Sequence, residues 1–428
     1  MSSTASIPET MSFAKPTGIG PAFAVGFFFA LRVIIELVWV RVLGVDSRTG
    51  SELSLAMGFL LLGFVYFYTL GACNRTFVSM FRLASIRWVG IFLVFSCCSL
   101  AWSGTALLPA AIAYWCGMAA DVAMVALLLR AEPPTGVASS LMKGFIACAC
   151  LTALIAWIMP AQYDLRLGED EFFNPNSIGN LCAFGFFMAQ YLARRKDGKW
   201  GLVSTFLAVT LLRSLSKTTI AAFVVSAGFL VVQDASMSRK TKMLLTTAAV
   251  LIVVAFWGLL ESYYVVYTNA GNQAETITGR IGIWAYMLNG ALEQPWIGHG
   301  FDSVWKVIPP FGEFEARHAE NELLQQFYAY GAAGICMLAG LYASLYRQLR
   351  RLPRGPLKVI FISMLLFAVV RGFAEAEPFD LLLPLWLIVL ISPLADEVRD
   401  RSSLELQEGT APDRELAAKP ADVLSPAG

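Results

Sequence analysis

Charged side chains are scarce in this sequence. Only 15% of its 428 residues are Asp, Glu, Lys or Arg, whereas soluble globular proteins carry about 25%. The hydrophobic fraction is 57%, so the chain has too little polar surface to face water on all sides. Many apolar runs approach the ~20 residues that a helix needs to cross a bilayer. We therefore predict an all-α, polytopic membrane protein.

Several motifs of soluble enzymes are also missing. The sequence has no GxxxxGK[ST] phosphate loop, no HExxH, no CxxC pair and no DxD motif. An ATP-driven machine, a metal hydrolase and a glycosyltransferase with a DxD-bound metal therefore have no support. We expect no cofactor, no metal ion and no nucleic-acid partner.

Two features of exported soluble proteins are absent as well. The eight cysteines lie within or beside apolar runs, so we interpret them as small packing groups and expect no disulfide framework. The polar N-terminus has no short apolar run followed by a cleavage site, so no cleaved signal peptide is expected.

Hydrophobic runs predict about twelve transmembrane spans, with a large loop between the ninth and the tenth. The spans are expected at 20–41, 52–72, 87–103, 105–129, 138–160, 176–193, 200–215, 218–233, 243–260, 322–346, 356–372 and 380–395. Arg213 and Lys217 divide one long apolar run, which predicts two short helices that meet at a tight turn.

Lys and Arg gather in alternate short loops, which predicts the orientation of the chain. Basic loops face the cytoplasm, so both termini are expected there and the loop at 261–321 on the opposite, outer face. The expected organisation is a cytoplasmic N-terminus, spans one to nine, the outer loop with an amphipathic helix, spans ten to twelve, and a disordered cytoplasmic tail, at 1–19, 20–260, 261–321, 322–395 and 396–428.

Charges within the predicted spans are few. Arg32 and Glu36 lie one helical turn apart in the first span, which favours a structural ion pair over a proton or substrate relay. Asp121 in the fourth span has no local partner, and a neighbouring helix is within its reach.

Four predicted outer loops, at 161–175, 213–217, 261–321 and 371–380, carry basic residues. The positive-inside rule disfavours such residues on that face. They are Arg166, Arg213 with Lys217, Arg280 with Arg317, and Arg371. An anionic ligand bound at the outer face would explain this recurrence. The alternative is ordinary pairing with the acidic residues of the same loops.

Four polar patches stand out in the outer loops. The first two lie at the starts of the sixth and eighth predicted spans. Arg166 precedes Asn174-Pro175-Asn176, where Asn176 is expected to cap the next helix and leave Arg166 free to point into a cavity. The stretch 214–219 places hydroxyls and Lys217 at the start of a short helix, which predicts an anion site. The alternative is a polar break between two spans.

The third patch opens with Thr278-Gly279-Arg280. Apolar residues recur after it at helical spacing, which predicts a helix whose apolar face lies on the membrane or on the bundle: Ile281, Trp284, Ala285, Leu288 and Leu292. Arg280, at the start of this helix, is placed to project toward a phosphate.

The fourth patch, Arg317 to Asn321, contains one of the two histidines. His318 beside the carboxylate of Glu320 suits general-base work on a hydroxyl, and a solvated loop histidine is the alternative. Gly331 and Gly334 predict close helix packing. The other histidine, His299 in Gly-His-Gly, is interpreted as a turn residue.

The order of these motifs resembles the O-antigen ligase and Wzy-type polysaccharide polymerase superfamily. The matching elements are Arg-x-Gly before Asn-Pro-Asn, Ser-x-Ser-Lys-Thr, Thr-Gly-Arg before Gln-Pro-Trp-Ile-Gly-His-Gly-Phe, and His before Glu-Asn-x-Leu-Leu-Gln and Gly-x-x-Gly, over roughly 160–340. A Trp-Ser-Gly at 102–104 also fits. Arg166, Lys217 and Arg280 match basic positions of the family, and Arg213 and Arg317 are additional candidates.

The resemblance implies a metal-independent membrane glycosyltransferase of the C-like type in the bacterial inner membrane. Such enzymes transfer a glycan from an undecaprenyl-diphosphate carrier to an acceptor at the periplasmic face. Cations there would hold the diphosphate leaving group, as the outer-face patches suggest. A chain-length regulator is a further partner expected of a polymerase.

One departure from the family pattern affects the expected base. The ligase subgroup has a His directly before the position of Asn321, but this chain has Glu320 there and His318 two residues earlier. Either residue is a candidate base or acceptor-orienting group, and Asn321 a candidate substrate contact. The departure favours a polymerase of exopolysaccharide or O-antigen repeat units over a ligase to lipid A core. A secondary transporter is a third hypothesis, but the long outer loop has no counterpart in the first half of the chain.

Overall fold

All regular elements in the described part of the chain are helices. The structure, a computed structural model, describes residues 20–71, 77–160, 162, 165–169, 173–195, 198–234, 238–240, 242–244, 247, 277–305, 307 and 318–409. These ranges contain helices joined by turns and loops, which confirms the predicted all-α class. Six helical stretches are long and apolar enough to cross a membrane by length and composition. The chain is therefore a multi-pass membrane protein, and the number of twelve spans stays a prediction.

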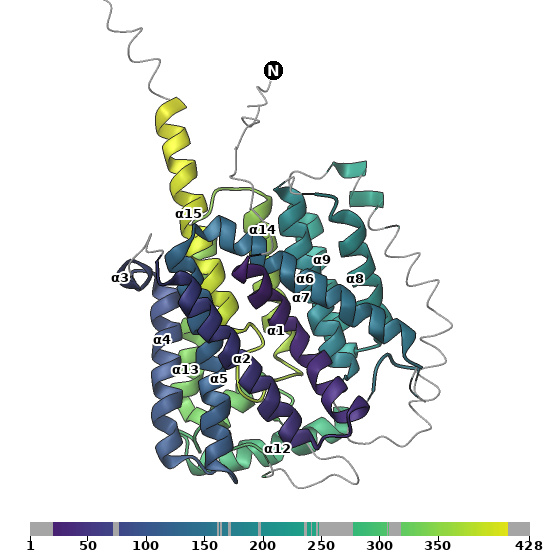
Figure 1. Cartoon of the computed structure of the whole chain (residues 1–428), viewed down its shortest axis with the longest axis vertical. Coiled ribbons are helices and arrows are strands. Elements are labelled where there is room, and N and C mark those ends of the chain that lie inside the picture. The colour runs from purple at the N-terminus through teal and green to yellow at the C-terminus, as the bar shows by residue number, and fades with distance from the viewer. Residues whose placement is uncertain are drawn as a thin grey trace, which may run out of the picture. The chain divides into compact units, whose positions relative to one another are not determined.

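Apart from α3 and the predicted loop helix α12, the helices follow the predicted spans in order (Figure 1). They are α1 (Pro21–Leu37), α2 (Ser47–Thr69), α3 (Phe77–Met80), α4 (Ala84–Ser99), α5 (Leu108–Ala131), α6 (Pro134–Ile158), α7 (Pro175–Arg194), α8 (Gly201–Arg213), α9 (Lys217–Gln233), α12 (Ile277–Glu293), α13 (Glu322–Arg350), α14 (Pro356–Arg371) and α15 (Leu385–Gly409). The break between α8 and α9 lies where the sequence predicts a tight turn. The predicted ninth span, 243–260, lies almost wholly outside the described residues.

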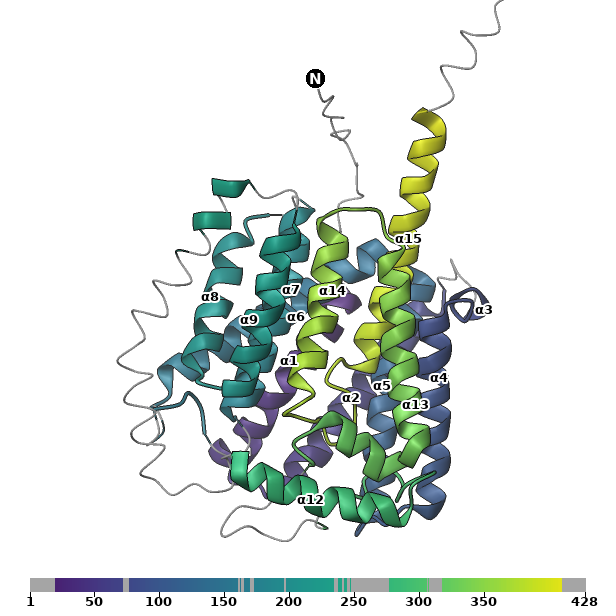
Figure 2. The same ribbon diagram turned by 180° about the vertical axis from the view of Figure 1, so that it is seen from behind.

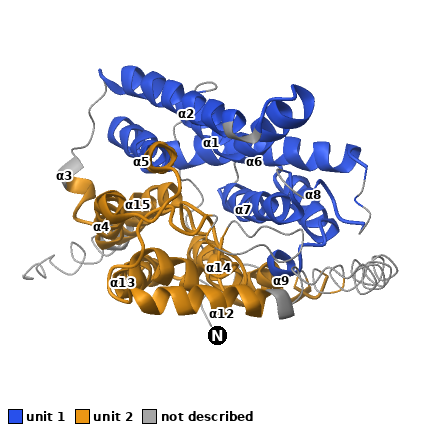
Figure 3. Cartoon of the chain, turned by 90° about the horizontal axis from the view of Figure 1, so that it is seen from below, with its two compact units in different colours: residues 1–77, 116–220 blue, residues 78–115, 221–428 orange. Residues whose placement is uncertain are grey.

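The chain divides into two compact units (Figure 3). Unit 1 consists of Met1–Phe77 and Cys116–Ile220, and unit 2 of Val78–Trp115 and Ala221–Gly428. Each unit is built from segments that are distant in the sequence, so each depends on long-range packing.

In unit 1, glycines allow α1 and α6 to approach closely. A Cβ atom on Gly26 would lie 1.9 Å from the carbonyl oxygen of Leu141, and one on Gly144 would lie 2.0 Å from that of Phe23. Close backbone contact of this kind is a common means of helix association in membranes. Substitution of either glycine would force the two helices apart.

A partly buried ion pair also joins α1 to α5 in unit 1. Arg32 donates two hydrogen bonds to Asp121, of 2.7 Å and 2.6 Å, in a bidentate arrangement. The predicted partner of Arg32, Glu36 on the same helix, is therefore wrong. The fork of a guanidinium matches a carboxylate on the facing helix better than one a turn away on its own helix.

In unit 2, α13 packs against α4, α14 and α15, whereas α12 runs across the end of α13 (Figure 2). The buried side of α12 consists of Ile283, Met287 and Ala291, which contact a core that includes Tyr328. The predicted apolar face, which includes Leu288 and Leu292, is exposed instead. Trp284 of the same predicted face packs against this core, so the face is divided between the two surroundings, and its contact with the membrane stays a prediction.

Helix α13 is broken at Gly331. The backbone there is left-handed, with φ of 61° and ψ of −152°, and a Cβ atom would lie 2.4 Å from the carbonyl carbon of Trp296. The freed amides of Ala332 and Ala333 donate to the carbonyls of Pro295 and Trp296. Gly331 therefore accepts an inserted loop, which corrects the prediction that it serves close packing of two helices.

The inserted loop continues to Phe301 and is tied to the Trp-Ser-Gly motif. The amide of Gly104 donates to the carbonyl of His299, and that of Phe301 to Ser99 Oγ. The His299 ring stacks on Tyr328, and its Nε2 lies 2.9 Å from the carbonyl oxygen of Gly290. These contacts agree with the interpretation of His299 as a turn residue.

Helix α15 extends beyond the predicted twelfth span. It continues to Gly409, so residues 396–409 are helical and not disordered as predicted. Residues 410–428 lie outside the described part of the chain. Alternating charges, including Arg399 with Asp396, support the helix after its apolar part ends.

Candidate functional site

A group of charged residues and one histidine lies at the start of α13 in unit 2. His318 and Glu320 precede this helix, Arg280 lies in the first turns of α12, and Arg371 and Glu375 lie at and after the end of α14. We call these five residues the acid–base cluster. The sequence analysis named His318, Glu320 and Arg280 as candidate site residues. It did not predict that they lie beside Arg371 and Glu375.

Hydrogen bonds join the start of α13 to the segment that follows α14. Asn321 caps α13 by accepting a hydrogen bond from the amide of Leu324, and its Nδ2 donates to the carbonyl of Phe373. The amide of Glu322 donates to the carbonyl of Gly372. Asn321, a predicted substrate contact, thus has a structural task at the junction.

His318 lies between two carboxylates. Its Nδ1 is 3.7 Å from Glu320 Oε1, and its Nε2 is 3.7 Å from Glu375 Oε1. Nδ1 also accepts a hydrogen bond of 3.3 Å from the amide of Glu320. One hydrogen bond therefore fixes Nδ1, and a carboxylate lies near each nitrogen atom of the ring.

Two guanidinium groups neutralise these carboxylates. Arg280 Nη2 lies 3.2 Å from Glu320 Oε2, while its Nη1 donates to the carbonyl of Ala374. Arg371 Nη2 lies 3.8 Å from Glu375 Oε2. Charges alternate along the cluster, as buried charges require.

Arg371 is the most deeply buried cation of the cluster. Its side chain is 3% exposed, and that of Glu375 is 4% exposed. Arg371 Nη1 lies 3.6 Å from Glu377 Oε1, yet Nη1 and Nε make no hydrogen bond among the described residues. Buried donors in this state can take a further acceptor, such as a phosphate oxygen or water.

The same side chains resemble a metal site in outline. One ligand atom each of His318, Glu320 and Glu375 lies within 4.8 Å of the others. However, Glu320 faces Arg280 and Glu375 faces Arg371, and these cations would repel a metal ion.

In unit 1, the predicted Arg166 patch is formed by a folded loop before α7. Arg213 Nη1 donates a 2.7 Å hydrogen bond to the carbonyl of Leu165, which joins this loop to the end of α8. Leu165 and Gly168 have positive φ values of 68° and 84°. Arg166 itself is buried, with 7% of its surface exposed. The structure thus brings Arg166 and Arg213 to one loop.

Lys217 is exposed at the start of α9, after a tight turn. Leu215 in this turn has φ of 57°, and Ser216 Oγ donates to Asn176 Oδ1 at 2.6 Å. Asn174, and not Asn176 as predicted, caps α7 by accepting from the amide of Ser177. The correction follows from Pro175, which occupies the first helical position.

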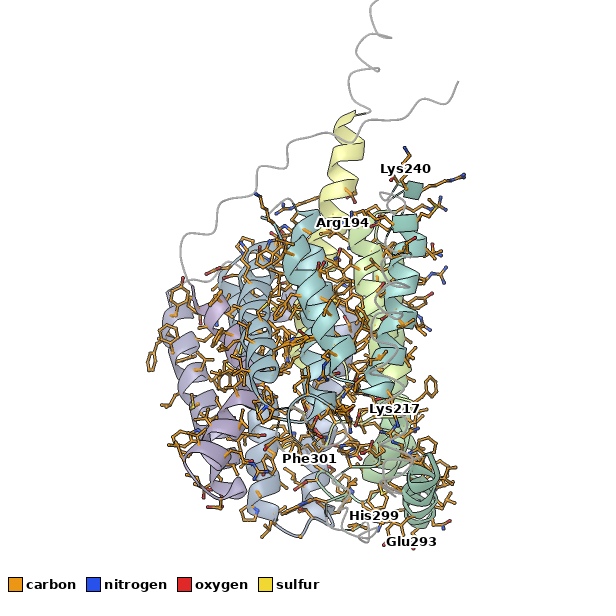
Figure 4. All side chains as sticks on the ribbon, turned by 90° about the vertical axis from the view of Figure 1, so that its right-hand side faces the viewer. Arg194, Lys217, Lys240, Glu293, His299 and Phe301 are labelled. Carbon is orange, nitrogen blue, oxygen red and sulfur yellow. The ribbon has the colours of Figure 1, made fainter. Side chains whose placement is uncertain are left out.

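The ends of each unit differ in the residues they carry. Within unit 1, Lys217 and Arg194 lie at opposite ends (Figure 4). Within unit 2, His299 and Lys240 do so as well. In unit 1, a basic residue beside a loop predicted to be cytoplasmic thus lies at the opposite end from the candidate site residue Lys217.

The predicted site residues fall into two groups. Arg166, Arg213 and Lys217 belong to unit 1, and the acid–base cluster with Asn321 belongs to unit 2. Arg317 lies outside the described residues. Arg371 stood out in the sequence as a basic residue in a predicted outer loop. Glu375, four positions later, was the signal that could have identified this pair as part of the cluster.

Comparison with known proteins supports a role in polysaccharide assembly. Residues 202–339 match the family described as O-antigen ligase. The chain is 24% identical over 328 residues to exopolysaccharide production protein ExoQ of Rhizobium meliloti (strain 1021), covering 69% of this chain and 73% of ExoQ. It is 26% identical over 132 residues to an O-antigen ligase of Pseudomonas aeruginosa PAO1, covering 31% of this chain and 32% of that ligase.

These matches confirm the resemblance predicted from the motifs. The family segment contains Lys217, Arg280 and the whole stretch from His318 to Gly334. It therefore spans parts of both groups of site residues. The chain is thus a membrane protein that resembles the O-antigen ligase and polysaccharide polymerase superfamily.

Proposed function

We propose that the protein transfers a glycan from undecaprenyl diphosphate to a sugar hydroxyl at the periplasmic face of the bacterial inner membrane. The observation that carries this proposal is the acid–base cluster, in which a histidine and two carboxylates lie beside two guanidinium groups. Such a cluster provides both a proton acceptor and cations for a departing phosphate.

The reaction balances without a cofactor. The acceptor hydroxyl oxygen forms a bond to the anomeric carbon of the donor glycan, and the bond from that carbon to the phosphate oxygen breaks. The bonding electron pair leaves with undecaprenyl diphosphate, and the hydroxyl proton passes to a base of the enzyme. His318 and Glu320 are the candidate bases.

The cations serve the leaving group. As the glycosidic phosphate bond breaks, negative charge grows on the diphosphate, and fixed positive charges lower the energy of that state. Arg166, Lys217 and Arg280, which match basic positions of the family, and Arg213 are the proposed contacts. Arg317 is a further candidate from the sequence.

Polymerisation of exopolysaccharide or O-antigen repeat units is the favoured form of this reaction. The similarity to the exopolysaccharide production protein extends over most of both chains, whereas the similarity to the O-antigen ligase covers about a third of each. Glu320 in place of the ligase histidine points the same way. Ligation of a glycan to lipid A core is the second candidate, supported by the family description.

The predicted topology is part of the proposal. Both termini face the cytoplasm, and the cluster lies on the side that the lipid-linked donor reaches after it crosses the membrane. The exposed apolar face of α12 would rest in the membrane interface near the diphosphate. A chain-length regulator is proposed as a protein partner of the polymerase.

Complementation of a deletion strain tests the function. Arg166→Ala, Lys217→Ala and Arg280→Ala should each shorten or abolish the polymer while the protein reaches normal levels in the membrane. Arg194→Ala, at the opposite end of unit 1 from Lys217, is the matched control and should make full-length polymer. Full-length polymer from all three site variants would refute the proposed role of these cations.

A further inference from the structure

The hydrogen bond from the Glu320 amide to His318 determines which nitrogen atom of the neutral ring carries the proton. The amide of Glu320 donates to Nδ1, so Nδ1 must present its lone pair. In the neutral ring the proton then lies on Nε2, which faces the buried carboxylate of Glu375. The lone pair of His318 is therefore already occupied by the backbone and is poorly placed to take a proton from an acceptor hydroxyl.

The carboxylate of Glu375 is itself fixed from behind. One oxygen faces His318 and the other faces Arg371, and both Glu375 and Arg371 are almost fully buried. A buried carboxylate oriented by a guanidinium is a suitable partner for a ring N–H, as in sites where a carboxylate selects a histidine tautomer. Glu375 and Arg371 can thus orient the ring of His318.

The backbone of Glu320 is held in a strained conformation by hydrogen bonds. Its backbone is left-handed, with φ of 51°, which is costly for a residue with a long side chain. The indole of Trp284 donates to its carbonyl, and its amide donates to His318, so the segment is fixed in this conformation. Its side chain remains 12% exposed, against 4% for Glu375.

We propose that Glu320 is the proton acceptor and that Glu375, backed by Arg371, is a positioning residue that sets the tautomer of His318. This proposal rests on the proposed function and specifies its base. The hydroxyl proton of the acceptor passes to an Oε atom of Glu320 as the new glycosidic bond forms, and it leaves to water after undecaprenyl diphosphate departs. His318 keeps its Nε2 proton throughout and holds the Glu320 segment in place.

Arg280 links this base to the donor. In the structure its guanidinium is paired with Glu320, and a bound diphosphate would compete for the same guanidinium. Binding of the donor therefore weakens the Arg280–Glu320 pair and leaves the carboxylate more basic, because an opposite charge nearby stabilises the ionised form. Activation of the base is thus coupled to the presence of the leaving group.

Nitrogen NMR of histidine tests the tautomer directly. The sequence contains two histidines, so a protein labelled with ¹⁵N-histidine gives few signals, and His318→Gln assigns them. We expect a pyrrole-type Nε2 and a pyridine-type Nδ1 for neutral His318. Glu375→Gln should produce a mixture of tautomers, whereas Glu293→Gln, which changes an exposed carboxylate at the far end of α12, should not. A proton on Nδ1 in the unaltered protein would overturn the proposal.

Activity provides the second readout. The probe is the lipid-linked oligosaccharide that accumulates in cells lacking this protein, added to the purified protein in vesicles. Glu320→Gln should lower the rate more than His318→Gln, and Glu375→Gln should lower the rate about tenfold without changing the donor concentration for half-maximal rate. Glu375→Asp should restore part of the rate.

The outcomes separate the two proposals. An unaltered protein that transfers no glycan from this probe would contradict the proposed function. A protein that transfers glycan but loses as much or more activity in His318→Gln as in Glu320→Gln would contradict only the assignment of the base.

Discussion

The two groups of site residues use positive charge in different ways. In unit 1, Arg213 is bound to a backbone carbonyl and Lys217 is exposed at the beginning of a helix. In unit 2, Arg280 and Arg371 alternate with carboxylates around one histidine. The first arrangement offers cations alone, whereas the second combines cations with carboxylates and an imidazole.

This difference predicts a division of labour. Under the proposed function, Arg166, Arg213 and Lys217 should contribute to holding the diphosphate, and Glu320 and Arg280 should determine the chemical step as well. Loss of a unit 1 cation should therefore weaken donor binding, and loss of the base in unit 2 should lower the maximal rate. The experiments below separate these effects.

Glu320→Gln should have the largest effect. The amide keeps the size of the side chain but cannot accept the hydroxyl proton, so the rate should fall by about 10²–10⁴, the usual contribution of a general base. The measurement is the initial rate of glycan transfer at saturating donor. A rate within a factor of two of the unaltered enzyme would place the base elsewhere.

Arg280→Ala should be nearly as damaging. Loss of a positioned cation beside the leaving group is expected to lower the rate by about 10²–10³. The maximal rate and the donor affinity should both change, because Arg280 contacts the base as well as the proposed diphosphate. Arg280→Lys should recover part of the activity, and full activity of Arg280→Ala would remove this residue from the site.

Lys217→Gln should have a smaller effect of a different kind. An exposed ammonium contributes about one factor of ten to binding of a phosphate, which corresponds to about 1.4 kcal/mol. We expect the donor concentration for half-maximal rate to rise about tenfold while the maximal rate changes little. A fall in maximal rate with unchanged donor affinity would contradict the division between the units.

Glycines with left-handed backbone support each group. In Gly168→Ala the Cβ atom would lie 2.0 Å from the carbonyl oxygen of Phe173, and in Gly331→Ala 2.4 Å from Trp296. Each substitution should destabilise its unit by about 1–3 kcal/mol, measured as a lower thermal midpoint. Gly63→Ala and Gly228→Ala, where a Cβ atom meets nothing within 4 Å, are the controls. Equal midpoints for all four variants would contradict the strained geometry.

Asp302 should give a weak pH dependence of stability in unit 2. Burial raises the pKa of this carboxyl from 3.8 to about 6, and the hydrogen bond from Thr105 opposes this rise. Between these pH values the folded protein retains a proton that the unfolded chain has lost, so the free energy of unfolding should fall as pH rises toward 6 and then level off. Asp302→Asn should flatten this slope in thermal unfolding, and an unchanged slope would assign it to another group.

The sequence predicted the local features of the fold better than its long-range contacts. Apolar runs located the helices, and the charges at Arg213 and Lys217 marked the turn between α8 and α9, because both follow from neighbouring residues. The partner of Arg32 lies 89 positions away, and Glu375 meets His318 from the end of another helix. Periodicity contains no information on such pairings.

For the candidate site, the sequence analysis named individual residues but missed the backbone feature that supports them. Arg280, His318 and Glu320 were identified by motif order and residue type, and the structure places them in contact. The kink at Gly331 was missed because a Gly-x-x-Gly pattern in an apolar helix usually indicates close packing. Here the inserted loop at Trp296 required the glycine, and that loop comes from a distant part of the chain.

The central claim is best tested by reconstitution. Purified protein in vesicles, supplied with the lipid-linked oligosaccharide from a deletion strain and no nucleotide-sugar, should form longer lipid-linked glycans and release one undecaprenyl diphosphate for each unit added. Mass spectrometry of glycan and carrier measures both products. Growth of the glycan in equal measure with carrier release supports the polymerase, and consumption of no donor by the unaltered protein would contradict the account.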